Sequence, residues 1–425
     1  GAGFALSNTG TIGLVSDATD RNLIFDGGGT ISHSGGGVLS ILGSGGTGAM
    51  LKGATTLDLS GGTVTTDGSV DLTVRDSSVL NVSAATSLPS GVELRLGDAA
   101  SETGIVSGSA TLTINDGLLV QHDSALSGSG LIVDLVSGSS LTINAGKILA
   151  VDDNAILKLG ITTGIATGRT IALTNSGAIA IESGASFTVS GGTIAGTGTI
   201  TNDGTFTLDG SASTVDIINT PIGTFNTVTA ASTAGALNNQ SGGTVNIDAG
   251  LTLSGTLTNA ASSTITIDTT SAGAALDLEA NGGSNAGTIN LFGPSGTGPG
   301  LKISAGATFT NTGTLQITTA ANIANHWLRL EAGSTFTNTG TIGAVSAAFD
   351  RHLFVEGLGT LYHNSGGVVS LLGGNSTGLR IQGGATMVLN GGTFTADAGS
   401  ELVVNDSSFL QVDAATTERS PAATH

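Results

Sequence analysis

Apolar residues alternate with Thr, Ser and Asn along most of the chain, in runs of four to six positions that end at Gly, Asn or Asp. Such alternation places the apolar side chains on one face of a β-strand, while Gly and Asn are typical of turns. The apolar periodicity of a helix is nearly absent. The pattern therefore predicts an all-β chain of short strands joined by tight turns.

The clearest repeat returns at an offset of 27 in the numbering. ATFTNTGTLQI at 307–317 returns as STFTNTGTIGA at 334–344. The residues before each copy also correspond: GLKISAG at 300–306 precedes the first and WLRLEAG at 327–333 precedes the second. Each copy predicts a strand, a glycine corner, a second strand, an Asn-Thr-Gly turn and a third strand. A strand-only repeat of this length is typical of one coil of a solenoid.

A Gly-Thr-apolar triplet marks further coils, with offsets of 19 to 27 between successive threonines, and Ser263-Thr264-Ile265 fills one gap in the series. We predict a single-stranded, right-handed parallel β-solenoid, or β-helix, with coils of roughly 19–27 residues. The apolar residues that follow the threonines should stack inside it: Phe206, Phe225, Val245, Ile265, Ile289, Leu315 and Ile342. The triplets are Gly204-Thr205-Phe206, Gly223-Thr224-Phe225, Gly243-Thr244-Val245, Gly287-Thr288-Ile289, Gly313-Thr314-Leu315, Gly340-Thr341-Ile342 and Gly359-Thr360-Leu361.

A second repeat is much longer than one coil. Residues 8–86 match residues 338–416 without a gap at an offset of 330, and about half of the positions are identical. The match predicts duplication of a module of many coils. We expect one continuous solenoid over 1–416, followed by a tail or cap at 417–425.

The Asn-Thr-Gly turns bring one amide to each coil, at Asn8, Asn311 and Asn338. Stacked amides hydrogen-bond to one another when identical strands lie in register. The repeats therefore predict an asparagine ladder running from coil to coil.

Charge and composition exclude several functions. Twelve basic residues against 31 acidic ones give a net charge of −19, so there is no basic stripe for nucleic acid or an anionic membrane. No apolar run is long enough to span a bilayer. The chain has no cysteine, and it begins at Gly1 without a signal peptide, so we expect a processed product or an internal fragment.

The repeated Asn-Thr-Gly-Thr-Ile units resemble the passenger regions of autotransporters and the filamentous-haemagglutinin-like bacterial surface proteins. The resemblance covers most of the chain. It implies a right-handed β-helix that is secreted and displayed at a bacterial cell surface. It implies no ligand, because such families include adhesins, proteases, cytolysins and passive spacers.

Acidic and histidine side chains are the candidates for chemistry. Asp152-Asp153 is the best carboxylate pair, but adjacent residues of a strand point to opposite faces, so we favour a solvated turn. Asp20-Arg21 and Asp350-Arg351 recur with the module, as do His33 and His363. Surface charge pairs and polar coil corners explain them, and an inter-module contact is the alternative.

Other ligand classes have weaker signals. Calcium would suit the acidic chain, but its Gly-Gly-x-Gly-x-Asp repeat is missing, and Asp26 followed by three glycines is isolated. Sugar platforms need exposed aromatic rings, and Trp327 and Tyr362 are the only Trp and Tyr, so we favour packing for Trp327. Phosphate loops are excluded because no Gly-Lys-Ser/Thr follows the glycines. Thr-x-Thr pairs are typical of ice-binding solenoids, but their spacing varies.

Three functions remain compatible with the sequence. We favour a structural and adhesive extracellular β-solenoid that forms or contributes to a bacterial cell-surface fibre, without catalysis or a cofactor. Its partners would be further copies of itself and a host or environmental surface. The alternative is a polysaccharide-acting β-helix enzyme, and the third is an ice- or mineral-binding Thr-rich solenoid.

End-to-end stacking is the predicted mode of self-association. A terminal coil has unpaired N–H and C=O groups, and no cap precedes the first Asn-Thr-Gly unit. The first coils copy 334–416, which should stack on the coil at 327–333. A head-to-tail contact would therefore extend as a fibre. The candidate assembly edge comprises Phe4, Leu6, Asn8, Ile12, Trp327 and Leu328.

Overall fold

The structure is a computed structural model that describes residues 4–15, 22–43, 47–98, 102–268, 275–292, 299–317, 324–345, 351–372 and 377–419. The regular elements in these ranges are all β-strands, and no helix that could cross a membrane occurs among the described residues. The chain divides into two compact units, Gly1–Thr205 (unit 1) and Phe206–His425 (unit 2).

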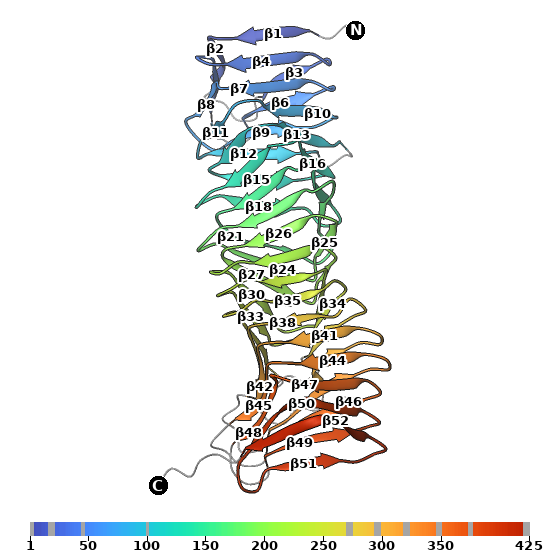
Figure 1. Ribbon diagram of the computed structural model, residues 1–425. Helices are drawn as coiled ribbons and strands as arrows, with labels where there is room; N and C mark the ends of the chain where they lie inside the picture. The colour runs from blue at the N-terminus through green and yellow to red at the C-terminus, as the bar shows by residue number, and fades with distance from the viewer. Residues whose placement is uncertain are drawn as a thin grey trace, which may run out of the picture. The chain divides into compact units, whose positions relative to one another are not determined.

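Unit 1 is a parallel β-solenoid in which a coil contributes three strands, as in β4 (Thr30–Ser34), β5 (Val38–Leu42) and β6 (Gly48–Lys52). Each of them pairs in parallel with the strand one coil later; Thr30, for example, pairs with Thr56. Figure 1 shows the strands of unit 1, in blue to green, stacked one above another. Parallel pairing leaves the turns to carry the chain from coil to coil.

The strands of unit 1 share lengths of three to five residues. They are β1 (Ala5–Asn8), β2 (Thr11–Val15), β3 (Asn22–Asp26), β4 (Thr30–Ser34), β5 (Val38–Leu42), β6 (Gly48–Lys52), β7 (Thr56–Ser60), β8 (Thr63–Thr66), β9 (Val70–Val74), β10 (Ser78–Val82), β11 (Thr86–Leu88), β12 (Val92–Leu96), β13 (Gly104–Gly108), β14 (Thr111–Ile114), β15 (Gly117–Val120), β16 (Ser124–Ser127), β17 (Ile132–Leu135), β18 (Ser140–Ile143), β19 (Ile148–Asp152), β20 (Ile156–Leu159), β21 (Thr162–Ala166), β22 (Thr170–Leu173), β23 (Ala178–Ile181), β24 (Ser186–Ser190), β25 (Thr193–Gly196) and β26 (Thr199–Asn202).

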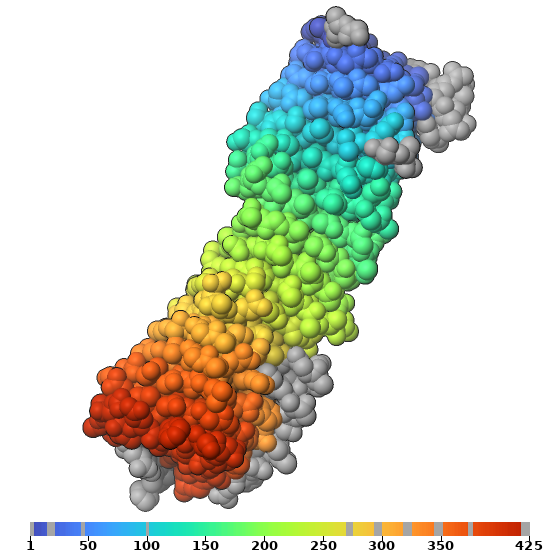
Figure 2. All heavy atoms as spheres, turned by 90° about the vertical axis from the view of Figure 1, so that its right-hand side faces the viewer, coloured from blue at the N-terminus to red at the C-terminus, as the bar shows by residue number. Residues whose placement is uncertain are grey.

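Unit 2 is built in the same way, and the length of its coils varies. Ser232 pairs with Leu251, at an offset of 19, whereas Thr314 pairs with Thr341, at an offset of 27. These registers confirm the predicted range of coil lengths. Within each unit the colour in Figure 2 changes in successive bands, because a coil packs against the coils just before and after it in the sequence.

The strands of unit 2 follow β27 (Thr205–Asp209), whose first residue closes unit 1. They are β28 (Ala212–Ser213), β29 (Asp216–Asn219), β30 (Thr224–Thr227), β31 (Ser232–Ala234), β32 (Leu237–Asn239), β33 (Thr244–Ile247), β34 (Leu251–Leu253), β35 (Leu257–Asn259), β36 (Thr264–Asp268), β37 (Leu276–Leu278), β38 (Gly283–Asn285), β39 (Thr288–Phe292), β40 (Pro299–Ile303), β41 (Thr308–Asn311), β42 (Thr314–Ile317), β43 (Ala324–Leu330), β44 (Thr335–Asn338), β45 (Thr341–Val345), β46 (Arg351–Gly357), β47 (Thr360–Asn364), β48 (Val368–Leu372), β49 (Gly378–Gln382), β50 (Thr386–Ala396), β51 (Glu401–Val404) and β52 (Phe409–Arg419).

The core of each coil is narrow and apolar because alternate strand residues point inward. In unit 2 the predicted apolar stack is confirmed: its seven residues, Phe206, Phe225, Val245, Ile265, Ile289, Leu315 and Ile342, are all buried. From Phe225 onward each of them pairs with the next. The Phe206 and Phe225 rings are stacked with centroids 5.5 Å apart, which adds aromatic contact to the burial of apolar area.

One assignment within the triplet series is wrong. The sequence places Thr360 one coil after Thr341, at an offset of 19, but Thr341 pairs with Val368. Thr360 instead pairs with Thr335, because its strand β47 stacks on β44 and not on β45. Two strands of one coil carry similar Thr-apolar patterns, and the pattern alone does not distinguish the faces.

The two copies of the long module have the same internal pairing. In the first copy Asn8 pairs with His33, and in the second Asn338 pairs with His363. Pairing of Thr30 with Thr56 likewise returns at an offset of 330. The repeat in sequence is therefore a repeat in local structure. Continuity over 1–416, the right-handed coil and the cap at 417–425 stay predictions; β52 reaches Arg419.

Candidate functional site

A ladder of buried side-chain amides runs through unit 2. Asn219 Nδ2 donates to Asn239 Oδ1 at 2.8 Å, and each following amide repeats the bond at 2.7–2.8 Å. Each amide ends a strand and lies within hydrogen-bond distance of a backbone carbonyl as well; the Asn239 amide, for example, donates to Thr264 O at 3.2 Å. The members, which are 0–1% exposed, are Asn219, Asn239, Asn259, Asn285, Asn311 and Asn338.

This amide ladder confirms the predicted stacking of Asn311 and Asn338 and extends it through four asparagines that sequence reasoning missed. A signal for them exists. Asn219, Asn239 and Asn259 each stand five residues before the threonine that marks a coil, whereas Asn285 stands three residues before its threonine, as Asn311 does. The changing turn length hides the period.

His363 terminates the ladder. Its Nδ1 lies 3.1 Å from Nδ2 of Asn338, and its side chain is fully buried against the edge of the Phe394 ring. An amide nitrogen can only donate, so His363 Nδ1 must accept and the imidazole must be neutral with its proton on Nε2. Burial lowers the pKa of His363 from its ordinary value of 6.5, and the Thr393 carbonyl opposes this less strongly.

The first module copy has the same arrangement. Asn8 Nδ2 lies 3.0 Å from His33 Nδ1, and His33 Nε2 lies 3.0 Å from the Thr63 carbonyl. Both contacts together fix the neutral tautomer with the proton on Nε2. The sequence predicts polar coil corners for His33 and His363; instead both lie in strands and are buried. Asp20, Arg21 and Asp350, and the side chain of Arg351, lie outside the described residues.

The predicted assembly-edge residues fall into two groups. Phe4 and Leu6 are exposed at β1 in unit 1, Ile12 is half-buried, and Asn8 is buried. Trp327 and Leu328 lie in β43 of unit 2, which pairs with β40 on one side and β46 on the other. Leu328 is therefore buried and shows how such a coil stacks inside one chain.

Trp327 belongs to a stack of side chains on the paired strands β43, β46 and β49. Its ring lies over that of Phe354 with centroids 5.2 Å apart, and the Arg380 guanidinium lies 5.8 Å from the Phe354 centroid. One ring face of Trp327 is thereby covered, which leaves less surface for a sugar ring to stack on. Tyr362 is exposed.

The carboxylate pair favoured by the sequence forms a turn. The backbone N–H of Asp153 donates to Asp152 Oδ1 at 2.8 Å, and Ser127 Oγ donates to Asp153 Oδ2 at 3.0 Å. Asp153 has a φ of 52°, the left-handed conformation of a turn residue. The two carboxylates bind separate local donors in this turn.

A group of carboxylates that sequence reasoning missed lies on β9 and β12 and just before β15. Asp71 pairs in register with Glu93, and both contact Arg95, at 2.8 Å and 2.6 Å. Together with Asp116 they line a hollow of about 410 Å³. Burial raises the pKa of Asp71. The positive charge of Arg95 lowers this pKa, and the negative charge of Glu93 raises it by a smaller amount. Residues 22 apart meet here through register alone, so no local motif marks them.

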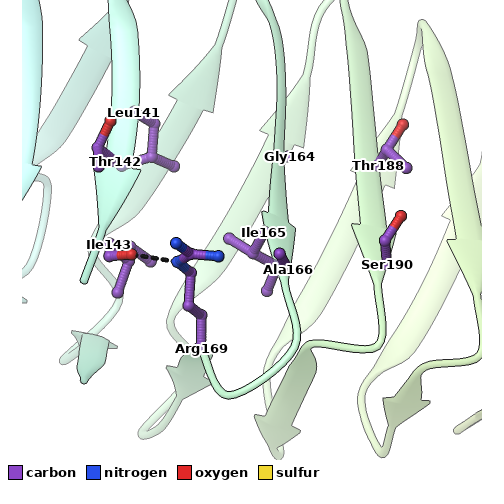
Figure 3. A pocket seen from close by; sticks show the side chains of 9 residues that line it. All are labelled: Leu141, Thr142, Ile143, Gly164, Ile165, Ala166, Arg169, Thr188 and Ser190. Atoms are coloured by element: carbon purple, nitrogen blue, oxygen red, sulfur yellow. Dashed lines mark hydrogen bonds between the residues drawn. The ribbon is translucent and has the colours of Figure 1, made fainter. Parts of the chain in front are cut away.

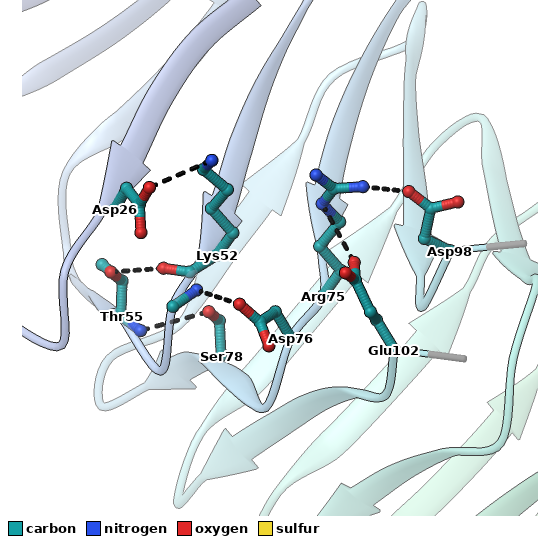
Figure 4. A network of polar contacts seen from close by, with 9 residues as sticks. Asp26, Lys52, Thr55, Arg75, Asp76, Ser78, Asp98 and Glu102 are labelled. Atoms are coloured by element: carbon teal, nitrogen blue, oxygen red, sulfur yellow. Dashed lines mark hydrogen bonds and ion pairs between the residues drawn. The ribbon is translucent and has the colours of Figure 1, made fainter. Parts of the chain in front are cut away.

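Other ion pairs connect neighbouring coils of unit 1. Asp26 binds Lys52 at 3.0 Å, and Arg75 contacts both Asp98 and Glu102 (Figure 4). No cluster of three acidic or histidine side chains that could hold a metal ion occurs among the described residues. Asp26, which begins the isolated glycine-rich turn, forms its salt bridge with Lys52 of the next coil.

On the strands from β30 to β45 of unit 2, a row of outward threonines lies beside a row that contains several amides. Thr224, Thr244 and Thr264 pair in series, and the file continues through Thr288 to Thr341. The position two residues further on holds Asn226 and Asn246, which are hydrogen-bonded at 2.9 Å. On these strands the surface is therefore a mixture of Thr and amide side chains, whereas β41 and β44 pair two threonines each, Thr308 with Thr335 and Thr310 with Thr337.

The chain matches no protein-family model and no curated protein. Among solved structures it is similar to a crystal structure of a TibC-catalyzed hyper-glycosylated TibA fragment, with 13% sequence identity and a TM-score of 0.23. The match covers 98% of this chain and 100% of that fragment. A similarity of this size carries no inference about function.

Proposed function

We propose that this chain is a structural and adhesive β-solenoid that contributes to a bacterial cell-surface fibre. The observation that carries the proposal is that buried amides and ion pairs of the chain connect neighbouring coils to one another. The buried amides join coil to coil, and the described ion pairs of Lys52, Arg75 and Lys302 also bridge neighbouring coils. Such side chains hold an extended scaffold together, and the resemblance to autotransporter passengers supports an extracellular location.

Fibre growth would occur by stacking of chain ends. Leu6 at β1 is 45% exposed, whereas its counterpart in the second module copy, Phe336, is fully buried beneath Phe309 of the preceding coil. Val412 in β52 is 63% exposed, whereas its counterpart Val82 is fully buried because β13 covers β10. Each exposed surface therefore has a buried equivalent, covered by a coil, within the same chain.

The edge of β1 that faces away from β4 can be altered without disturbing the pairing of these two strands. The N–H of Thr30 donates to Phe4 O at 2.8 Å, so the backbone groups of residues 4, 6 and 8 face β4, and those of Ala5 and Ser7 face away. Proline at residue 7 would remove an N–H from the outer edge only.

Negative-stain microscopy of the 425-residue chain across salt and concentration tests the stacking. The net charge of −19 repels copies, so longer assemblies should form at higher salt. Ser7→Pro should give short particles under every condition while its circular dichroism stays that of the wild-type chain. Ser32→Pro, at the position paired with Ser7 in the next coil, is the control for an internal defect. Single short particles of the wild-type chain at all salt concentrations would refute stacking.

A polysaccharide-acting enzyme is the second candidate, and the hollow at Asp71, Glu93 and Asp116 favours it. A half-buried carboxyl with a raised pKa suits a general acid, and a second carboxylate nearby suits a base. Arg95 binds both Asp71 and Glu93 and lowers the pKa of Asp71, which favours a structural role instead. Turnover of pectin or alginate that is lost in Asp71→Asn but kept in Asp152→Asn would establish the enzyme.

A further inference from the structure

The strand stacking of unit 1 is interrupted at one place. β18 forms the last strand of a six-stranded sheet and pairs only with β15, while β21 pairs with β24. No strand pairing joins β18 to β21 in the described structure, although they belong to consecutive coils. Figure 3 shows the space between the two strands and the side chain of Arg169 reaching into it.

Backbone groups of both strands face this gap. The N–H groups of Ser140 and Asn144 donate to the preceding coil, so those of Leu141 and Ile143 point the other way, toward β21. The N–H of Ser186 donates to Ile161 O, so the groups of Gly164 and its alternate neighbours point toward β18. Strand edges that lack a ladder need other hydrogen-bond partners.

Arg169 supplies the positive charge at the gap. Its Nε donates to the Ile143 carbonyl, and the rest of the guanidinium lies in the space between the strands. Among the described residues Arg169 forms no ion pair, whereas Arg75, Arg95 and Lys158 each contact two carboxylates. In a chain with a net charge of −19, an unpaired guanidinium in a hollow is well placed to bind an anion.

The hollow has a volume of about 350 Å³ and two kinds of wall. Leu141, Ile143 and Ile165 form an apolar floor, because their side chains point into the core. Hydroxyl groups line the outer part, and no ion pair of the described chain occupies it. These groups are Thr142, Thr188 and Ser190.

We propose that this gap binds the carboxylate of an acidic sugar residue, a uronate. The outer nitrogens of Arg169 would bind the carboxylate, and backbone N–H groups of the open strand edges would complete its hydrogen bonds. The hydroxyls of Thr188 and Ser190 match the hydroxyls of a sugar ring, and the apolar floor matches its C–H face. The site goes beyond fibre assembly and does not depend on it, because all its residues belong to unit 1.

Titration of the full chain with sodium galacturonate, monitored by calorimetry or ligand-observed NMR, tests the site. Galactose lacks the carboxylate and acetate lacks the ring, so both should bind at least about 10-fold more weakly, as expected for loss of a charge-assisted hydrogen bond or of the ring contacts. Absence of saturable galacturonate binding in the millimolar range overturns the proposal. Equal binding of galactose or of acetate also overturns it.

Variants locate the binding. Arg169→Gln should weaken galacturonate binding by about 10-fold or more, whereas Lys147→Gln, which removes the same charge one coil earlier, should leave it within about 2-fold. An equal loss in both variants would mean unspecific attraction and would contradict the site. Circular dichroism and thermal unfolding establish that Arg169→Gln is folded.

The hydroxyl rim offers a test that leaves Arg169 in place. Thr188→Val keeps the shape of the side chain and should weaken galacturonate binding by about 5-fold, the value of a neutral hydrogen bond, without changing acetate binding. Unchanged galacturonate affinity in both Thr188→Val and Ser190→Ala would remove sugar recognition from this site.

Discussion

The Nδ2 atom of Asn338 lies 3.1 Å from Nδ1 of His363, and this contact ends a file of six buried amides with a neutral imidazole. The preceding coils have asparagine at this position, and its Oδ1 accepts the hydrogen bond without ever carrying a proton. The last coil of the ladder has His363 instead, whose accepting nitrogen can be protonated. A titratable group is thereby placed at the end of the amide ladder.

The stability of the chain should fall when the solution is made more acidic than pH 6.5. Burial lowers the pKa of His363 below that value, so the unfolded chain takes up a proton before the folded chain does. The contribution of His363 to the free energy of unfolding is fully present above pH 6.5. It decreases by about 1.4 kcal/mol per pH unit between pH 6.5 and the pKa of His363 in the folded chain, and it is constant at lower pH. Urea unfolding at a series of pH values measures the slope.

His363→Asn is the matched variant for this pH dependence. Asparagine offers Oδ1 to the Asn338 amide and so continues the ladder, but it does not titrate. The difference in unfolding free energy between wild type and variant should therefore change with pH below 6.5 and be flat above it. A difference that is independent of pH throughout would show that His363 is not the group responsible.

Much of this architecture follows from local pattern, and the rest depends on register. The apolar stack from Phe206 to Ile342 is predicted because each member follows a marked threonine. Thr360 is misassigned because two strands of one coil have the same pattern, and only pairing with Thr335 distinguishes them. A different reason hides the amides before Asn311: their turns differ in length, so their spacing from the marked threonine is not constant.

The candidate sites are less predictable than the fold. Asp71 and Glu93 meet because their strands are in register, and the gap at Arg169 exists because one pairing is missing. Neither leaves a motif in the sequence. His33 and His363 are conspicuous in the sequence because they recur with the module, but their burial depends on the coils stacked around them.

An asparagine in the middle of the ladder should be more important for stability than one on the surface. Asn259→Ala removes the acceptor of the Asn239 amide and the donor to Asn285, so both buried amides lose their hydrogen bond along the ladder. We expect a loss of about 2–4 kcal/mol in unfolding free energy. Asn246→Ala removes one half-buried amide bond to Asn226 and should cost about 1 kcal/mol or less. Equal losses in the two variants would contradict a special role for burial.

The apolar stack should show the cost of a cavity. Phe225 is fully buried and stacks on Phe206, so Phe225→Ala should lower unfolding free energy by about 3–5 kcal/mol. Thr224→Ala, one residue earlier on the outward face, is the control and should change it by about 0.5 kcal/mol or less. Urea titrations of both variants measure the difference. A small loss for Phe225→Ala would mean that the core of unit 2 is loosely packed.

The glycine beside His33 should be needed for the imidazole to reach Asn8. A Cβ at Gly62 would lie 2.3 Å from His33 Cδ2 and 2.4 Å from Nε2, closer than any real contact. Gly62→Ala must therefore displace the ring, which breaks the bonds to Asn8 and Thr63 and should cost about 1–3 kcal/mol. Gly10→Ala is the control, because a Cβ there meets no atom within 4 Å. In a spectrum of the chain labelled at its histidines, Gly62→Ala should shift the His33 ring signals and Gly10→Ala should leave them in place. Unshifted His33 signals together with wild-type stability in Gly62→Ala would contradict the contact.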